Sequence, residues 1–107
     1  SGSDTSAVAL GVAFGARVEF YKDVPGIFSE DPKTNSRAMV YPSLSYEAAL
    51  EIVNRGAKVL HPRSILLAKK NAVPLHVRSF YSYREESGTI VQEQSGLKRS
   101  ERLYEGI

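Results

Sequence analysis

YKDVPGIFSEDPK, residues 21–33, is the stretch around which the chain is organised. An alternating run at residues 17–21 leads into it and predicts a strand. The chain then breaks twice. Pro25 fixes φ and Gly26 permits a positive φ, which predicts a type II turn, and Pro32 biases the residue before it away from helix. A strand therefore ends in an irregular loop, and in open α/β sheets ligands bind outside the carboxyl ends of the strands.

This loop carries the kinds of side chain that bind a nucleotide. Phe28 offers an aromatic surface for a base, Asp23 a carboxylate for a hydroxyl or amino group, and Lys33 a cation for phosphate. Ordinary turn chemistry also explains Pro, Gly and Asp in such a stretch. From these residues alone, a nucleotide site and a plain surface loop both remain open.

The composition is that of one globular domain. The 107 residues are 42% hydrophobic and 24% charged, which argues against disorder of the chain as a whole. The net charge of +2 is too small to indicate a nucleic-acid partner, and the lack of cysteine excludes disulfides and thiolate metal sites. No apolar run nears the ~20 residues of a membrane helix, so no membrane partner is expected. The lack of cysteine is compatible with the cytoplasm, where we expect the protein to be located. The chain lacks an initiating methionine, and we expect it to be a piece of a longer protein.

Three helices are predicted. The first covers residues 7–14, with Ser3 or Asp4 as its N-cap, Gly11 at a close approach to the sheet and Gly15 at its end. The others follow from apolar spacing and from their caps, and cover residues 45–55, capped by Ser45 and Gly56, and residues 63–70, capped by His61 and Asn71.

Further strands are predicted at residues 74–80 and 89–91, with a short one at residues 37–41 inside a long loop. Helices alternating with strands indicate an α/β fold. The polar tail, residues 92–107, reads as a linker or a frayed helix.

Other segments have a functional and a plain interpretation. The Gly/Ser-rich turn before the first helix suits an anion, or is simple capping. Lys58, in a turn between two helices, can reach a phosphate, or is a solvated lysine. Residues 78–84 interleave arginines with aromatics, as single-strand nucleic-acid sites do, or form an exposed strand end. His61 and His76 are the only histidines, so no metal site is expected.

Five segments together resemble the aspartokinases. They occur in that family's order and spacing, and are SDTSA (3–7), DVPGIF with DPK (23–33), GAKVLHP (56–62), VPLHVRS (73–79) and GT (88–89). The DV-x-G and DP pattern is shared across the wider amino-acid kinase superfamily, including uridylate kinases, whereas GAKVLHP is much more specific to aspartokinases. The resemblance covers about residues 1–91.

The resemblance implies a three-layer αβα sandwich of the amino-acid kinase type, present here only as its C-terminal, nucleotide-binding half. Residues 1–91 would form this half, and residues 92–107 a linker or tail towards absent regulatory domains. The implied protein is a homo-oligomeric aspartate kinase, which transfers the γ-phosphoryl group of ATP to the side-chain carboxylate of L-aspartate, the first step towards lysine, threonine and methionine. Mg²⁺ would be held mainly through the nucleotide phosphates.

The resemblance also implies roles for single residues. The glycine-rich turn that meets aspartate and the transferred phosphate matches Gly2, Ser3 and Asp4, with Asp4 orienting the catalytic lysines. The nucleotide-binding positions match Lys22, Asp23, Phe28, Lys33 and Lys58.

Three of these positions depart from the family pattern: Lys22 replaces the usual Thr, Phe28 the usual Tyr and Lys33 the usual Arg. The amino-terminal Lys-x-Gly-Gly phosphate site, the rest of the aspartate pocket and the regulatory ACT domains lie outside these 107 residues, so we expect the chain alone to be inactive. Two alternatives stay open: another kinase of the superfamily that is similar to the uridylate kinases, and a non-catalytic nucleotide-binding module.

Overall fold

The computed structural model describes residues 2–82, 84 and 87–94, which contain three helices and four strands. Their bounds, in chain order, are α1 Gly2–Phe14, β1 Val18–Lys22, β2 Ser43–Leu44, α2 Tyr46–Asn54, α3 Pro62–Asn71, β3 Leu75–Ser79 and β4 Thr89–Val91. The predicted tail falls mostly outside the described residues, since only residues 92–94 of it are described.

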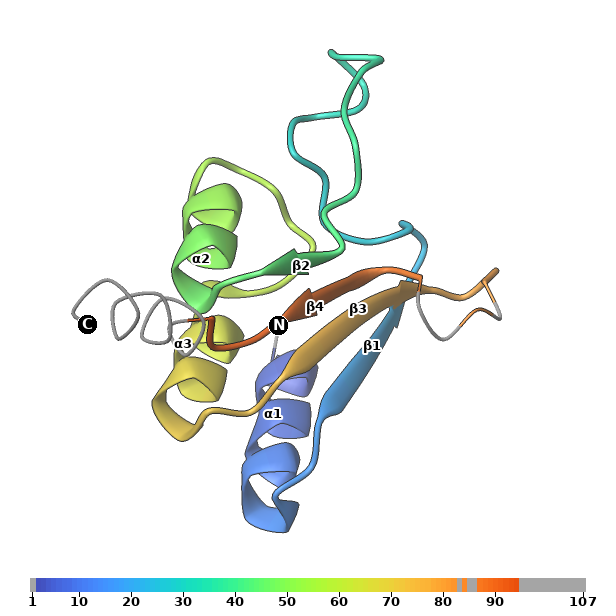
Figure 1. Ribbon diagram of the computed structural model, residues 1–107. Helices are drawn as coiled ribbons and strands as arrows, with labels where there is room; N and C mark the ends of the chain where they lie inside the picture. Colours follow the sequence, from blue (N-terminus) through green and yellow to red (C-terminus); the bar gives the residue numbers. More distant parts are fainter. Residues whose placement is uncertain (1, 83, 85–86, 95–107) are drawn as a thin grey trace, which may run out of the picture.

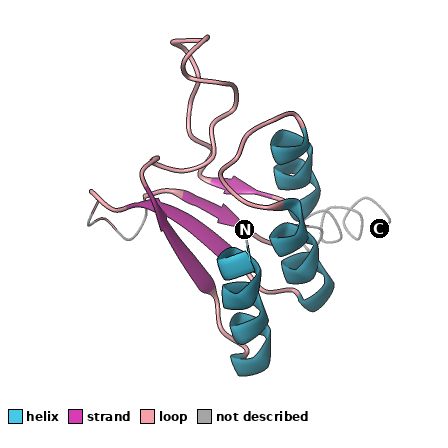
Figure 2. Ribbon diagram, turned by 180° about the vertical axis from the view of Figure 1, so that it is seen from behind, coloured by secondary structure: helices cyan, strands magenta, loops and turns pink. Residues whose placement is uncertain are grey.

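The four strands form one mixed sheet in the order β1-β3-β4-β2. β1 runs parallel to β3, β3 antiparallel to β4, and β4 parallel to β2. The three helices cover one face of the sheet, with α3 in contact with both α1 and α2 (Figures 1 and 2). This arrangement confirms the predicted α/β class, and the described residues supply a sheet and one helical layer of the expected sandwich.

The core lies between the sheet and the helices. Alternate residues of β1 and β3 face it, because Val18 pairs with Leu75 and Phe20 with Val77, and all four are buried. Gly11 lets α1 approach closely, since a Cβ there would lie 2.4 Å from the Val18 side chain. The close approach predicted for this glycine is confirmed.

The opposite face of β1 and β3 is charged. The Tyr21 hydroxyl donates to Glu19 at 2.9 Å, and the guanidinium groups of Arg17 and Arg78 lie 3.2 and 3.6 Å from the same carboxylate. The hydrogen bond from Tyr21, and then these positive charges, lower the pKa of Glu19. Arg78 is buried and also donates to the backbone carbonyl of Arg84. Arg78 is therefore not part of an exposed row of arginines and aromatics, whereas Phe80 and Tyr81 of the same segment are exposed.

Two of the predicted helix ends need correction. Ser3 and Asp4 are not N-caps, because α1 already begins at Gly2 and both residues lie in its first turn. Asn71 is the last residue of α3, and the left-handed cap is Ala72, with φ 54°.

The caps predicted at Gly15, Ser45 and His61 are confirmed, whereas the C-cap of α2 is Arg55 and Gly56 follows it. Gly15 has φ 61°. The Ser45 side chain accepts from the backbone N–H of Ala48, and His61 Nδ1 from that of Arg63.

The short strand predicted at residues 37–41 is wrong. Only Val40 pairs there, in an isolated bridge with Phe28. The strand that joins the sheet is β2, two residues long, whose place is set by pairing with β4. Its pairing partner lies more than 40 residues away, so no local pattern marks it.

Candidate functional site

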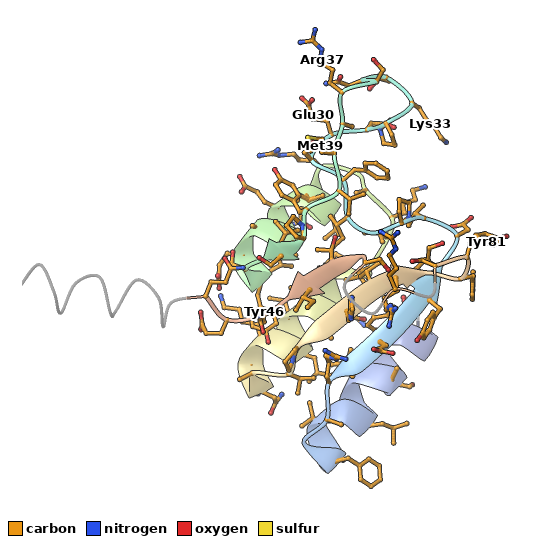
Figure 3. The ribbon with its side chains drawn as sticks, turned by 45° about the vertical axis from the view of Figure 1, so that its right-hand side comes forward. Glu30, Lys33, Arg37, Met39, Tyr46 and Tyr81 are labelled. Carbon is orange, nitrogen blue, oxygen red and sulfur yellow. The ribbon has the colours of Figure 1, made fainter. Side chains whose placement is uncertain are left out.

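A long loop leaves the carboxyl end of β1 and rises above the sheet (Figure 1). Its two arms pair with each other: Tyr41 N–H donates to the carbonyl of Ile27 at 2.9 Å, and Ser29 N–H to that of Met39 at 2.8 Å. Beyond these bonds the loop projects outward and carries Lys33 at its exposed end (Figure 3).

The turn at the base of this loop differs from the prediction. Gly26 has φ 158°, far from the roughly +80° that a type II turn needs. The N–H of Ile27 donates to the hydroxyl of Thr89, 2.9 Å away on β4. The chain is therefore turned here by a contact with a distant strand.

A cleft of about 830 Å³ lies between this loop and the connection from α2 to α3. We call its two sides the loop wall (residues 22–24 and 26–33) and the turn wall (residues 52 and 55–59). Its charged lining consists of four cations, Lys22, Lys33, Arg55 and Lys58, and three carboxylates, Asp23, Glu30 and Asp31. A cleft with a slight excess of cations, one aromatic ring and several apolar side chains has the character of a small-anion or nucleotide site.

The structure brings together every side chain that the sequence assigns to a nucleotide. On the loop wall these are Lys22, Asp23, half-buried Phe28 and exposed Lys33, and on the turn wall exposed Lys58. The two walls are joined from segments about 30 residues apart in the chain, which is why neither stretch alone identifies the cleft.

Asp4 does not line the cleft but contacts a residue that does. Lys22 Nζ lies 3.3 Å from its carboxylate, and both side chains are mostly shielded, with 28% and 17% of their surface exposed. The ammonium also lies 5.6 Å from the centre of the Phe20 ring. Gly2 and Ser3 belong to the same first turn of α1. The amino end of α1 is thus joined to the loop wall by one ion pair.

The turn wall is built from helix ends. Arg55 caps α2 through its N–H, which donates to the carbonyls of Glu51 and Ile52 at 3.1 and 3.2 Å. Gly56 follows with φ 122°, a conformation that favours glycine, and Lys58 comes two residues later. The sequence motif identified Lys58, but not Ile52 and Arg55. The sequence signal that could have identified both is their position shortly before the Gly-Ala-Lys turn.

The carboxylates of the cleft are the candidate ligands for a metal ion. Across the described ranges, no three histidine, aspartate or glutamate side chains gather as potential ligands. This donor set does not form a cage of its own, but Asp23 can complete the shell of an Mg²⁺ that is bound chiefly through phosphate oxygens.

None of α1, α2 and α3 combines the length and the apolar character that a membrane crossing needs.

Comparison with known proteins gives concordant results. The sequence model of the amino acid kinase family matches residues 1–79. Aspartokinase 2 of Bacillus subtilis is 45% identical over 100 residues, which cover 92% of this chain and 24% of that protein. The chain spans about a quarter of the length of the curated relatives it matches.

Two solved structures have the same fold. Aspartate kinase from Synechocystis superimposes with a TM-score of 0.79 at 44% identity, over 87% of this chain and 16% of that one. Escherichia coli aspartokinase III, in complex with aspartate and ADP, superimposes with a TM-score of 0.78 at 37% identity, over 87% of this chain and 21% of that one.

Proposed function

The chain belongs to the amino acid kinase family, and from that premise we propose that it is the nucleotide-binding half of the catalytic domain of an aspartate kinase. The reaction is transfer of the γ-phosphoryl group of ATP to the side-chain carboxylate of L-aspartate. The observation that carries this proposal is the cleft in which Lys22, Phe28, Lys33 and Lys58 meet from two segments.

The nucleotide would lie between the two walls. Phe28 would pack against the base, and Asp23 would accept hydrogen bonds from its hydroxyl or amino groups. Lys58 and Lys33 would neutralise phosphate charge from opposite sides. Lys33 acts as a point charge only, because an ammonium lacks the bidentate fork of the arginine usual in the family.

The acceptor end would lie at the first turn of α1. Gly2, Ser3 and Asp4 would meet aspartate and the transferred phosphate, where the positive end of the helix favours an anion. Asp4 already holds Lys22 at 3.3 Å, which fits a role in orienting lysines more than a role as a base. Lys22 would therefore stand between donor phosphates and acceptor, with its charge directed by Asp4.

Phosphoryl transfer needs positioning and charge neutralisation more than covalent catalysis, and lysines on two walls suit that demand. Mg²⁺, when bound with ATP, would supply charge neutralisation at the phosphates, and Asp23 is the loop-wall carboxylate that we assign to its shell.

Several wider features belong to the same proposal. The first 91 residues would form half of the catalytic domain, and residues 92–107 a link to regulatory domains. The 107 residues alone would be inactive, since the aspartate pocket and a second phosphate site would come from elsewhere in a homo-oligomeric, cytoplasmic enzyme. Its product would enter the synthesis of lysine, threonine and methionine.

The test is ADP release by the full-length protein with Mg-ATP and, in turn, L-aspartate, L-glutamate and UMP. We expect release with aspartate, reduced by about 100-fold in Lys58→Ala, a typical cost of removing one group that stabilises transition-state charge. Lys70→Ala, a lysine exposed at the end of α3 and outside the cleft, is the matched control and should keep full activity.

The other outcomes discriminate between the alternatives. Release with UMP and not with aspartate would assign the protein to a nucleoside monophosphate kinase. Nucleotide binding without release to any acceptor would indicate a binding module that keeps the fold without the reaction.

A further inference from the structure

Thr89 lies between the two ends of the long loop, although it belongs to β4 and is outside the cleft lining. Its side chain is completely buried. The hydroxyl accepts from the N–H of Ile27 at 2.9 Å and donates to the carbonyl of Tyr41 at 2.5 Å. One hydroxyl group thus binds the start and the end of the loop at the same time.

The surroundings leave this hydroxyl little freedom. A Cβ on Gly26 would lie 2.7 Å from Thr89 Oγ1, and one on Gly88 only 2.1 Å from the carbonyl oxygen of Val77, so the backbones meet here without space between them. β4 is held between β3 and β2, and its Ile90 N–H donates to the carbonyl of Pro42 at 3.0 Å. The loop is therefore fastened to an interior strand of the sheet.

We propose that Thr89 is a positioning residue for the nucleotide, acting through the loop wall. This inference rests on the proposed nucleotide site and adds to it a residue that touches neither ATP nor aspartate. The bond to Ile27 fixes the backbone immediately before Phe28, and the bond to Tyr41 fixes the returning arm that pairs with it. Together they set the distance between Phe28 and Lys58 across the cleft.

The affinity for nucleotide should depend on how well the long loop is ordered. Residues 30–38 are mostly exposed and contact little of the core, so their place depends on the arms below them. Without the hydroxyl, the loop wall would occupy further positions, and bound nucleotide would have to select the competent one. Its apparent affinity then falls in proportion to the population of that position. Aspartate, bound at α1, should be affected far less.

The experiment compares Thr89→Val with Thr89→Ser in the full-length protein. Valine keeps the shape and removes both hydrogen bonds, whereas serine keeps the hydroxyl. Tyr46→Phe is the matched control, because the buried Tyr46 hydroxyl donates to the carbonyl of Val73 at 2.7 Å in a region that does not line the cleft. Three quantities are measured: the Kd for ADP by calorimetry, the KM for aspartate, and the amide exchange of residues 27–41.

For Thr89→Val we expect the Kd for ADP to rise about tenfold, a factor within the range expected for losing the two hydrogen bonds of the hydroxyl. The KM for aspartate should stay within about twofold, and exchange at residues 27–41 should quicken. Thr89→Ser and Tyr46→Phe should keep the wild-type Kd and the slow exchange of the loop.

Equal Kd values for Thr89→Val and Tyr46→Phe, with wild type binding ADP normally, would overturn the inference and leave the proposed function intact. Failure of the wild-type protein to bind ADP would instead overturn the proposed function, and the nucleotide role of Thr89 with it. Amide exchange would then still decide whether Thr89 holds the loop, since unchanged exchange in Thr89→Val would refute that as well.

Discussion

The two walls of the cleft are held in place by different means. The loop wall is fixed by polar contacts with distant parts of the chain, namely Thr89 on β4 and Asp4 on α1. Among the contacts described, the turn wall has no such distant partner, because it consists of the end of α2 and of residues 55–59, which lie between core residues Val53 and Leu60. A cation on the turn wall is therefore set by the helices, whereas one on the loop wall depends on contacts that a single substitution can remove.

The largest expected difference between the walls concerns the two lysines proposed to bind phosphate. In the full-length protein, Lys58→Ala should lower kcat/KM for ATP by about 100-fold, whereas Lys33→Ala should lower it by less than about tenfold. Both lysines are exposed, but Lys33 lies on the projecting part of the loop, beyond the bonds that pair its arms, whereas Lys58 is held near the end of α2 (Figure 3). Steady-state kinetics at two salt concentrations measures both effects. A larger loss in Lys33→Ala would reverse the assignment of the walls.

A second difference concerns one glycine in each wall. A Cβ on Gly26 would lie 2.7 Å from both Thr89 Oγ1 and Val40 Cγ1, and neither β-branched side chain can turn away easily. Gly26→Ala should therefore reduce stability by about 2 kcal/mol. A Cβ on Gly56 meets nothing within 4 Å, so Gly56→Ala should cost only about 1 kcal/mol, for its φ of 122°.

The measurement for both glycines is the free energy of opening of Leu75–Ser79, obtained from native-state amide exchange of the full-length protein. This strand is interior and buried, so its opening reports on the stability of the whole sheet and on each substitution alike. Equal costs for the two alanines would mean that the contacts around Gly26 yield freely, and that the loop wall is not closely packed.

The ion pair between Lys22 and Asp4 should have a smaller effect. It connects the loop wall to α1, whereas the ion pair of the turn wall, Arg55 with Glu51, lies within the end of α2. In a double-mutant cycle of Lys22→Met and Asp4→Asn, we expect a coupling energy of about 0.5–1 kcal/mol, the upper part of the range for partly exposed pairs. Amide exchange in β1 measures it. A coupling near zero would show that the two residues act independently.

The difference between the walls also explains what could be predicted from the sequence. The turn wall follows from local signals: the apolar spacing of α2, the glycine after it and the capping of α3 by His61. For the loop wall, the sequence predicted which side chains line the cleft but not the backbone conformation that places them. The turn at Gly26 is determined by Thr89, 63 residues further along the chain, and propensity carries no information about such a contact.

Two elements of the fold, β2 and the start of α1, were also missed by local sequence patterns. β2 is two residues long and exists through its pairing with β4, so local preference placed a strand at residues 37–41 instead. The first helix was expected to start later, because Ser3 and Asp4 are good caps and are equally acceptable in a first turn. Five side chains of the cleft were identified by motif, whereas the lining position of Arg55 and the contacts of Thr89 depend on the fold.

The smallest expected effect compares two carboxylates that lie behind the walls. Glu19 is on β1, which leads into the loop wall, and its pKa is lowered chiefly by the hydrogen bond from Tyr21. Because this pKa is lower in the folded protein, its contribution to stability is present above the ordinary glutamate pKa and is lost as the pH falls through the lowered value. Glu51, behind the turn wall, pairs with Arg55 at 3.2 Å, but about 70% of each side chain is exposed.

Glu19→Gln should therefore lower the thermal midpoint of the full-length protein by about 1–2 °C at pH 7, with a difference from wild type that shrinks as the pH is reduced towards 3. Glu51→Gln should leave the midpoint unchanged at every pH, since an exposed pair of this kind contributes little. Thermal scans of the three proteins at pH 7, 5 and 3 make the comparison. A difference for Glu19→Gln that stays constant down to pH 3 would show that packing beneath β1, and not the charge of its carboxylate, supports the strand that carries the loop wall.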